Sequence, residues 1–254
     1  YTQLDWLMFA ISGVALGGAA WKLMRARSAW AELPVTATEP LPNFPPRLRA
    51  FAANPPIWLI LALGAIVLAL RRPDQIHTPQ FWAEDGIFFF QAHEIGLPAF
   101  GLELAGYSQL APRVIAALSQ LVDPAWAPHV FAAAGLALTL YVMSRALSPR
   151  CPLPHRAWAA LAIVLVPDAA EVLLNANNIQ WILACGGLLL LVSREPTRRA
   201  EWAHDVVAAF FFGLTGPFSV LLAPFFAVRA AVRRTRASLA LAGVIVFCAA
   251  VQVT

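Results

Sequence analysis

The sequence has 254 residues, of which 60% are hydrophobic and 13% are charged, and its mean hydropathy is +0.67. Soluble domains carry about a quarter charged residues, so this chain lacks the polar surface needed to cover itself in water. The net charge of +4 does not indicate nucleic-acid binding, because the basic residues lie in short clusters at the ends of apolar runs. We exclude a soluble globular enzyme, a disordered protein and a secreted disulfide scaffold. The composition predicts an all-α, polytopic integral membrane helical bundle.

Eight hydrophobic segments predict the helices of this bundle. They span residues 5–24, 56–72, 125–144, 157–172, 179–193, 203–215, 218–230 and 237–254. The sixth and seventh segments are each too short for a full crossing at about 1.5 Å per residue. Because Gly216 and Pro217 break the chain between them, we expect a hairpin of two short helices whose tip is shielded by protein.

The distribution of lysine and arginine predicts the orientation of the chain. Fifteen of the 18 basic residues lie in four segments, 22–55, 145–156, 194–202 and 229–236. By the positive-inside rule these four segments are cytoplasmic, which places residue 1 on the outer side of the membrane.

The chain divides into three parts in sequence. Residues 1–30 hold a separate N-terminal membrane span, and residues 31–55 form a Pro-rich cytoplasmic linker. Residues 56–254 form the main transmembrane bundle. Because the sequence starts with Tyr1 and stops inside an apolar run, we expect it to be a fragment of a longer polypeptide, incomplete at the C-terminus.

The outer loop 73–124 is long for a helical bundle, and long loops often carry function. Two pieces of it, 85–96 and 112–122, are predicted to form amphipathic helices that lie along the membrane surface.

The stretch 81–90 (FWAEDGIFFF) places two adjacent carboxylates, Glu84 and Asp85, between large aromatic side chains. Such a pair cannot be buried in ionised form without a cation, a hydrogen-bond network or a raised pKa. One carboxylate poised as a general base would fit this environment. The alternative is an acidic surface loop, or Asp85 as the N-cap of a helix at 86–96.

A wider set of motifs accompanies the acidic pair. They are Trp82-Ala83-Glu84-Asp85-Gly86, Gly106-Tyr107, Pro112-Arg113, Ala127-Pro128, residues 175–181 (NANNIQW) and Leu214-Thr215-Gly216-Pro217-Phe218. Together they resemble uncharacterised bacterial members of the GT-C superfamily of membrane glycosyltransferases, which use polyprenyl-phosphate sugars. The resemblance covers residues 56–254, the N-terminal half of a typical member.

The resemblance implies that Asp85 is the base that deprotonates an acceptor hydroxyl, with Glu84 beside it as a helper or metal ligand. A sugar phosphoester has a good leaving group, so the reaction needs a base and a cation near the phosphate more than a general acid. Arg113 is the only outer-side arginine away from the pair Arg71-Arg72, and it could hold the phosphate bidentately. A salt bridge from Arg113 to Glu103 or to the acidic pair is the alternative.

Amide side chains gather between two apolar segments at the outer face: Asn175, Asn177, Asn178 and Gln180. They could donate hydrogen bonds to sugar hydroxyls, with Trp181 and Tyr107 as stacking surfaces. A polar turn that caps two helices, next to an interfacial aromatic belt, is the alternative explanation.

A divalent metal bound at Glu84 and Asp85, with His77 and His93 nearby, is a further hypothesis. The spacing of these residues does not match a metal-binding motif. No other cofactor is implied, because the sequence has no P-loop, dinucleotide fingerprint or nucleophile elbow. Cys151, Cys185 and Cys248 lack metal-ligand spacing and are expected to be unpaired.

Two functions from different classes remain. The first is a glycosyltransferase in a bacterial inner membrane that uses a polyprenyl-phosphate sugar donor at the outer face. The second is a non-catalytic transmembrane subunit or scaffold of a larger membrane complex. Membrane lipid is the expected surrounding in both, other membrane subunits are partners in the second, and nucleic acid is a partner in neither.

Overall fold

The computed structural model describes residues 55–167 and 169–254. The chain divides into two compact units, Tyr1–Pro56 and Ile57–Thr254. The predicted span at 5–24 and nearly all of the linker at 31–55 lie outside the described residues. The description that follows therefore concerns the second unit alone.

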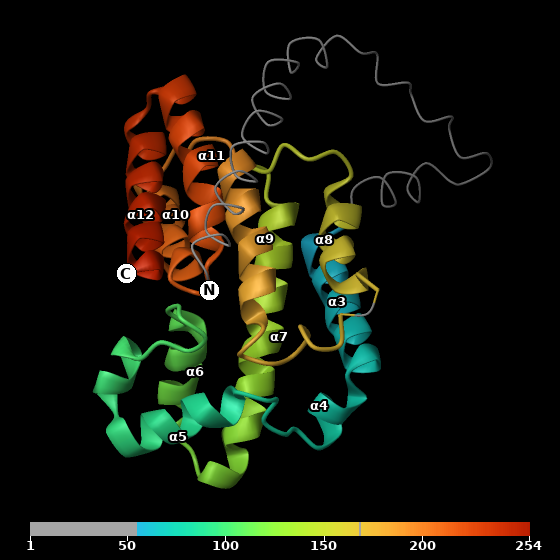
Figure 1. Cartoon of the computed structure of the whole chain (residues 1–254). Helices are drawn as coiled ribbons and strands as arrows, with labels where there is room; N and C mark the ends of the chain where they lie inside the picture. The colour runs from blue at the N-terminus through green and yellow to red at the C-terminus, as the bar shows by residue number, and fades with distance from the viewer. Residues whose placement is uncertain (1–54, 168) are drawn as a thin grey trace, which may run out of the picture. The chain divides into compact units, whose positions relative to one another are not determined.

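The described residues are helical, and the all-α prediction is confirmed (Figure 1). The α-helices are α3 (Ile57–Arg71), α4 (Pro73–His77), α5 (Asp85–Ile95), α6 (Leu110–Ser119), α7 (Ala127–Leu147), α8 (Arg156–Leu165), α9 (Ile179–Val192), α10 (Arg199–Gly213), α11 (Phe218–Arg233) and α12 (Arg236–Val253). Two short 3₁₀ helices, η1 (Leu97–Gly101) and η2 (Pro124–Trp126), complete them. In this part of the chain, β-pairing is limited to two isolated bridges.

Seven of the predicted hydrophobic segments coincide with helices, and three of these helices, α8, α10 and α11, differ clearly in length from the prediction. Helix α8 ends at Leu165, well before residue 172, because Pro167 forces the residue before it into an extended conformation. Helices α10 and α11 are longer than the predicted hairpin helices, with 15 and 16 residues. The turn between them is at Gly216, as expected, where φ is +80°.

The helices pack around three groups of buried side chains. One lies among α3, α7, α8 and α9, a second among α9 to α12, and a third between α5, α6 and the start of α7. Phe88, Phe131 and Phe226 are among the largest fully buried side chains. The third group is the one that fixes α5 and α6 to the bundle.

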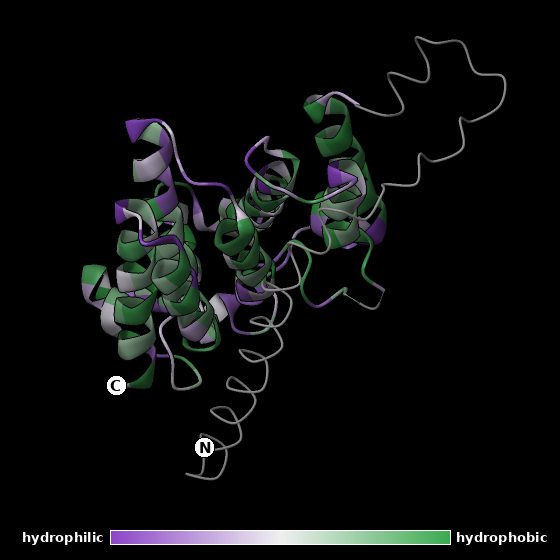
Figure 2. Ribbon diagram, turned by 90° about the horizontal axis from the view of Figure 1, so that it is seen from above, coloured by the Kyte–Doolittle hydropathy of each residue, from purple (hydrophilic) through white to green (hydrophobic). Residues whose placement is uncertain are grey.

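The two ends of the bundle differ in chemistry. At the α5–α6 end, α5 and α6 meet the connection 166–178 and the turn 214–217. At the opposite end, named here the arginine end, α7, α9 and α11 finish and α8, α10 and α12 begin. Figure 2 shows hydrophobic residues along most of the helix lengths and hydrophilic residues mainly at helix ends and connections.

Arginines cap helices at the arginine end. Arg229 is 4% exposed and donates to the carbonyls of Leu190 (2.6 Å) and Leu191 (2.9 Å), which are among the last in α9. Guanidinium groups satisfy such orphan carbonyls and interact favourably with the helix dipole. Arg229 and Arg233 also pair with Glu195.

Two helices, Pro124–Leu147 and Arg236–Val253, are long and apolar enough to cross a membrane. Helices α3, α6, α8 and α9 are apolar but shorter. Length and composition thus give weak support for membrane association, and the eight-segment membrane bundle stays a prediction.

Candidate active site

Arg72 holds part of the connection between α8 and α9 in place. This residue is 5% exposed and donates to the carbonyls of Ala170 (2.5 Å) and Leu173 (2.9 Å). Its guanidinium also pairs with Asp74 and lies over the ring of Trp82. Arg72 therefore ties the end of α3 both to this connection and to the turn that precedes α5.

Asp85 is the first residue of α5 and is 1% exposed. The backbone N–H of Asn177 donates to its Oδ1 (2.8 Å), and those of Trp82 (3.3 Å) and Ala176 (3.4 Å) donate to its Oδ2. The carboxylate therefore joins the turn before α5 to the connection before α9, 91 residues further along the chain.

The pKa of Asp85 is raised to about 6, mainly by burial and to a small extent by the negative charge of Glu84. The three backbone N–H groups act in the opposite direction, because they stabilise the ionised form. No cation within ion-pair distance in the described chain compensates this carboxylate. Asp85 consequently gains or loses its proton close to neutral pH.

Glu84 is half-buried beside Asp85, and its environment is different. Its Oε2 accepts one hydrogen bond, from Nδ2 of Asn177 (2.9 Å). Oδ1 of the same asparagine lies 3.5 Å from Nε2 of Gln109, which is 1% exposed. Asn177 thus contacts both carboxylates, with its backbone on Asp85 and its side chain on Glu84.

Two of the predicted sugar-binding amides, Asn175 and Asn178, hold their own turn. Both side chains donate to the carbonyl of Glu171, at 2.5 and 2.8 Å, and Oδ1 of Asn175 accepts from the backbone N–H of Asn178 (2.8 Å). This is the geometry of the polar-turn alternative, in which the amides shape the backbone that presents Asn177.

Gln180 and Tyr107 are brought together, whereas Trp181 points elsewhere. Nε2 of Gln180 donates to the Tyr107 hydroxyl at 3.2 Å, and Gly216 packs closely against the Gln180 side chain. Trp181 is 52% exposed and contacts the edge of Phe218. Of the two predicted stacking residues, only Tyr107 therefore contacts the buried polar group.

Arg113 is buried, at 2% exposed, without a carboxylate partner among the described residues. It donates to Oε1 of Gln91 and to the carbonyl of Leu102 (3.1 Å), and its guanidinium lies 4.8 Å from the centre of the Phe88 ring. Its Nε has no partner, and burial lowers its pKa. The structure thus pairs Arg113 neither with Glu103 nor with the acidic pair.

Several polar residues at this end were not predicted from the sequence. Oγ1 of Thr215 accepts from the N–H of Ala111 (3.0 Å), and Nε2 of Gln252 donates to the carbonyls of Ser108, Gly213 and Gly216 at 3.0–3.2 Å. Gln252 is a lone amide in an apolar helix, and that signal could have drawn attention to it.

Two buried acceptor oxygens in this region lack a donor. They are the Oε1 atoms of Gln109 and Gln180, and Oγ of Ser219 is also unpartnered. A buried polar atom without a partner costs about 1–3 kcal/mol, so each acceptor favours a ligand or water that brings a donor. Hydroxyl groups would satisfy both oxygens.

The described residues contain no group of three or more His, Cys, Asp or Glu side chains that could hold a metal ion. His93 bonds to Gln120 (3.1 Å) and stacks on Phe89, and His77 is exposed. Neither histidine therefore joins the acidic pair. The three cysteines are free.

The fold and site define an all-helical protein with a buried, titratable aspartate at one end of its bundle. No family model, curated protein or solved structure matches this chain. Assignment of function therefore rests on the residues at the α5–α6 end.

Proposed function

We propose that this chain is a GT-C-like integral membrane glycosyltransferase. It transfers a sugar from a polyprenyl-phosphate carrier to an acceptor hydroxyl at the outer face of a bacterial inner membrane. Asp85 is the general base. The observation that carries the proposal is the burial of Asp85, whose pKa of about 6 lets it be ionised at neutral pH and still take a proton.

The neighbouring groups supply the other functions that this reaction needs. Glu84 carries a second carboxylate that is only half-buried and accepts one hydrogen bond. The guanidinium of Arg113 has no carboxylate partner in the described chain, so a donor phosphate would compensate its charge. The unpartnered oxygens of Gln109 and Gln180 would accept hydroxyl protons from a sugar.

The membrane part of the proposal is supported by the surface and ends of the bundle. Large apolar side chains are exposed along several helices: Trp58, Leu70, Leu188, Val207, Val232, Leu239 and Phe247. Ten of the thirteen described arginines lie at the arginine end. That end is therefore cytoplasmic and the α5–α6 end faces outward.

The test is sugar transfer by the full chain in membrane vesicles, using a panel of polyprenyl-phosphate hexoses and pentoses. Asp85→Asn should lower transfer by about 10²-fold or more, because the base is removed. Glu94→Gln is the matched control, since Glu94 is an exposed carboxylate on the same helix, and it should retain full transfer.

Folding must be checked at the same time, because Asp85 also accepts three backbone hydrogen bonds. Thermal unfolding in detergent should show that Asp85→Asn still melts cooperatively. Full transfer by a folded Asp85→Asn protein would refute the catalytic assignment.

A second function, a non-catalytic transmembrane subunit, is favoured by one observation. Both oxygens of Asp85 are occupied by backbone donors, and Asn175 and Asn178 are used within their turn. A purely structural role predicts that Asp85→Asn changes stability and that no donor in the panel is used. Recovery of the chain in fixed stoichiometry with other membrane proteins would support this second function.

A further inference from the structure

Five exposed arginines gather at two helix connections of the arginine end. Three lie between the end of α9 and the start of α10, and two lie between α11 and α12: Arg194, Arg198, Arg199, Arg234 and Arg236. None of the five forms an ion pair with a carboxylate in the described chain. We name these five residues the exposed arginine cluster.

The two connections are in contact, so their arginines share one surface. Oγ1 of Thr235 donates to Oε2 of Glu195 at 3.1 Å. Thr235 lies between Arg234 and Arg236 in sequence, and Glu195 directly follows Arg194. Helices α10 and α12, which both begin at this end, also pack against each other.

The carboxylates beside the cluster do not balance its charge. Glu195 is shared by the guanidinium groups of Arg229 and Arg233. Glu201 accepts a hydrogen bond from the backbone N–H of Thr197 (2.8 Å) and adds a single negative charge. The exposed arginine cluster therefore keeps an excess of positive charge.

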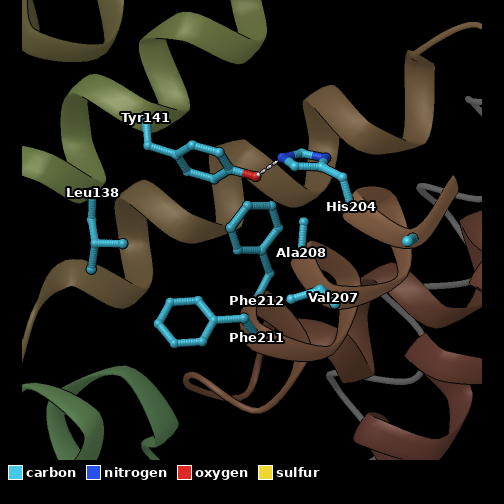
Figure 3. Close-up of a pocket in the computed structure, with 8 residues that line it drawn as sticks. Leu138, Tyr141, His204, Val207, Ala208, Phe211 and Phe212 are labelled. Atoms are coloured by element: carbon cyan, nitrogen blue, oxygen red, sulfur yellow. Dashed lines mark hydrogen bonds between the residues drawn. The ribbon is translucent and has the colours of Figure 1, made fainter. Parts of the chain in front are cut away.

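The buried carboxylate of the arginine end is also used by other groups. Asp205 is 1% exposed and pairs with Arg145 (3.2 Å) and Arg150. Nδ1 of His204 lies 3.4 Å from it, and Nε2 of the same imidazole lies 2.8 Å from the Tyr141 hydroxyl, as Figure 3 shows. Asp205 thus belongs to a separate, mostly buried ion cluster.

Helix stability does not account for the position of the exposed arginines. Arg198 directly precedes α10, Arg199 is its first residue, and Arg236 is the first residue of α12. The N-terminus of a helix carries a partial positive charge, so an arginine at this position is unfavourable for the helix. These positions favour an anion that the described chain does not supply.

The apolar neighbours of the cluster indicate which kind of anion fits. Val192, Trp202, Val232 and Leu239 are 39–57% exposed, and each lies two or three residues from an exposed arginine. Arginines beside exposed apolar and aromatic side chains are typical of the boundary between lipid headgroups and hydrocarbon. An acidic segment of another protein would match the charge but would not require these apolar neighbours.

We propose that the exposed arginine cluster binds headgroups of anionic phospholipids in the cytoplasmic leaflet and thereby enriches these lipids around the folded chain. Guanidinium groups bind phosphate through charge-assisted hydrogen bonds. The inference rests on the membrane placement in the proposed function, but not on the catalytic role of Asp85. It goes beyond orientation, because the positive-inside rule concerns insertion of the chain and not the lipids that it then selects.

The test uses the full chain in vesicles of equal amounts of phosphatidylglycerol and phosphatidylcholine with identical acyl chains. Native mass spectrometry after gentle extraction identifies the lipids that stay bound. Phosphatidylglycerol should be retained several-fold more than phosphatidylcholine, and high salt should reduce this preference. Equal retention of the two lipids would overturn the proposal and leave an acidic protein as the alternative partner.

Two triple variants test whether charge causes the preference. Arg194→Gln, Arg199→Gln and Arg236→Gln together remove three positive charges and should bring the retention of the two lipids close to equal. The matched control replaces the same three arginines with lysine, which keeps the charge and should keep most of the preference. Thermal unfolding should show that both variants fold. An unchanged preference in the glutamine variant, or the same loss in both variants, would contradict the proposal.

The same vesicles distinguish this inference from the proposed function. A chain that is removed by an alkaline wash is not membrane-embedded, and both proposals then fail. A chain that resists the wash but retains both lipids equally contradicts the lipid proposal alone. A chain that prefers phosphatidylglycerol but transfers no sugar contradicts the catalytic proposal alone, and Asp85→Asn should leave the lipid preference unchanged.

Discussion

Asp85 and Asp205 are each 1% exposed, at opposite ends of the same bundle, and the protein accommodates them differently. Three neutral backbone N–H groups surround Asp85, which has no cation beside it. Two guanidinium groups, those of Arg145 and Arg150, flank Asp205. A buried carboxylate held by neutral donors can change its protonation state near neutral pH, as the pKa of about 6 for Asp85 shows. One held between cations is part of a structural ion cluster.

The largest expected effect is a difference in stability between two variants, Asp205→Asn and Asp85→Asn. Asp205→Asn removes the buried counter-charge that two mostly buried guanidinium groups share and should lower the free energy of unfolding by about 3–5 kcal/mol. Asp85→Asn should cost roughly 1 kcal/mol at pH 7, because losing the burial cost of the charge offsets the lost acceptor. Denaturant unfolding in detergent measures both.

Equal losses in the two variants would break the comparison. They would mean that a buried carboxylate contributes the same to the free energy of unfolding whether its partners are neutral N–H groups or guanidinium groups.

The pH dependence of stability gives the next effect. Because the folded state raises the pKa of Asp85 from 3.8 to about 6, its contribution to stability is full below pH 4. It is lost as the pH rises through 6, where ionisation of the buried group costs about 3 kcal/mol. The stability advantage of the wild type over Asp85→Asn should therefore shrink between pH 4 and pH 7, as measured by unfolding at each pH. An advantage that grows over this range would contradict the assigned cause.

The sequence predicted most of the helices, because long apolar runs leave little choice of secondary structure in a chain with so few charges. It also predicted a helix that starts at residue 85 or 86, and α5 begins at Asp85. The N-cap residue is Glu84, however, so the alternative of Asp85 as the N-cap is wrong. The early end of α8 was missed, although Pro167 was visible in the sequence.

The site could be predicted only in part. The residues Glu84 and Asp85 stand out locally, but their partner Asn177 depends on how two segments about 90 residues apart pack. Arg113 could be recognised as an isolated arginine in the sequence, whereas its contacts with Gln91 and Leu102 depend on how α6 packs against α5 and the end of η1. Hydrogen bonds between segments so far apart in the sequence depend on how the helices pack, and residue type and local spacing do not predict that packing.

The smallest expected effect is the pH dependence of stability due to Glu195, and its direction should be opposite to that of Asp85. Glu195 lies at the arginine end, where burial raises its pKa but the hydrogen bonds from Arg233 and Arg229 outweigh this and lower the pKa overall. Its contribution to stability is therefore present above about pH 4.5 and is lost as the pH falls. The advantage of the wild type over Glu195→Gln should shrink as the pH falls below 4.5, the reverse of the trend for Asp85→Asn, in an unfolding series extended below pH 4. If both variants follow the same trend, the cations beside Glu195 and the neutral donors around Asp85 do not give the two carboxyl groups opposite pH dependences.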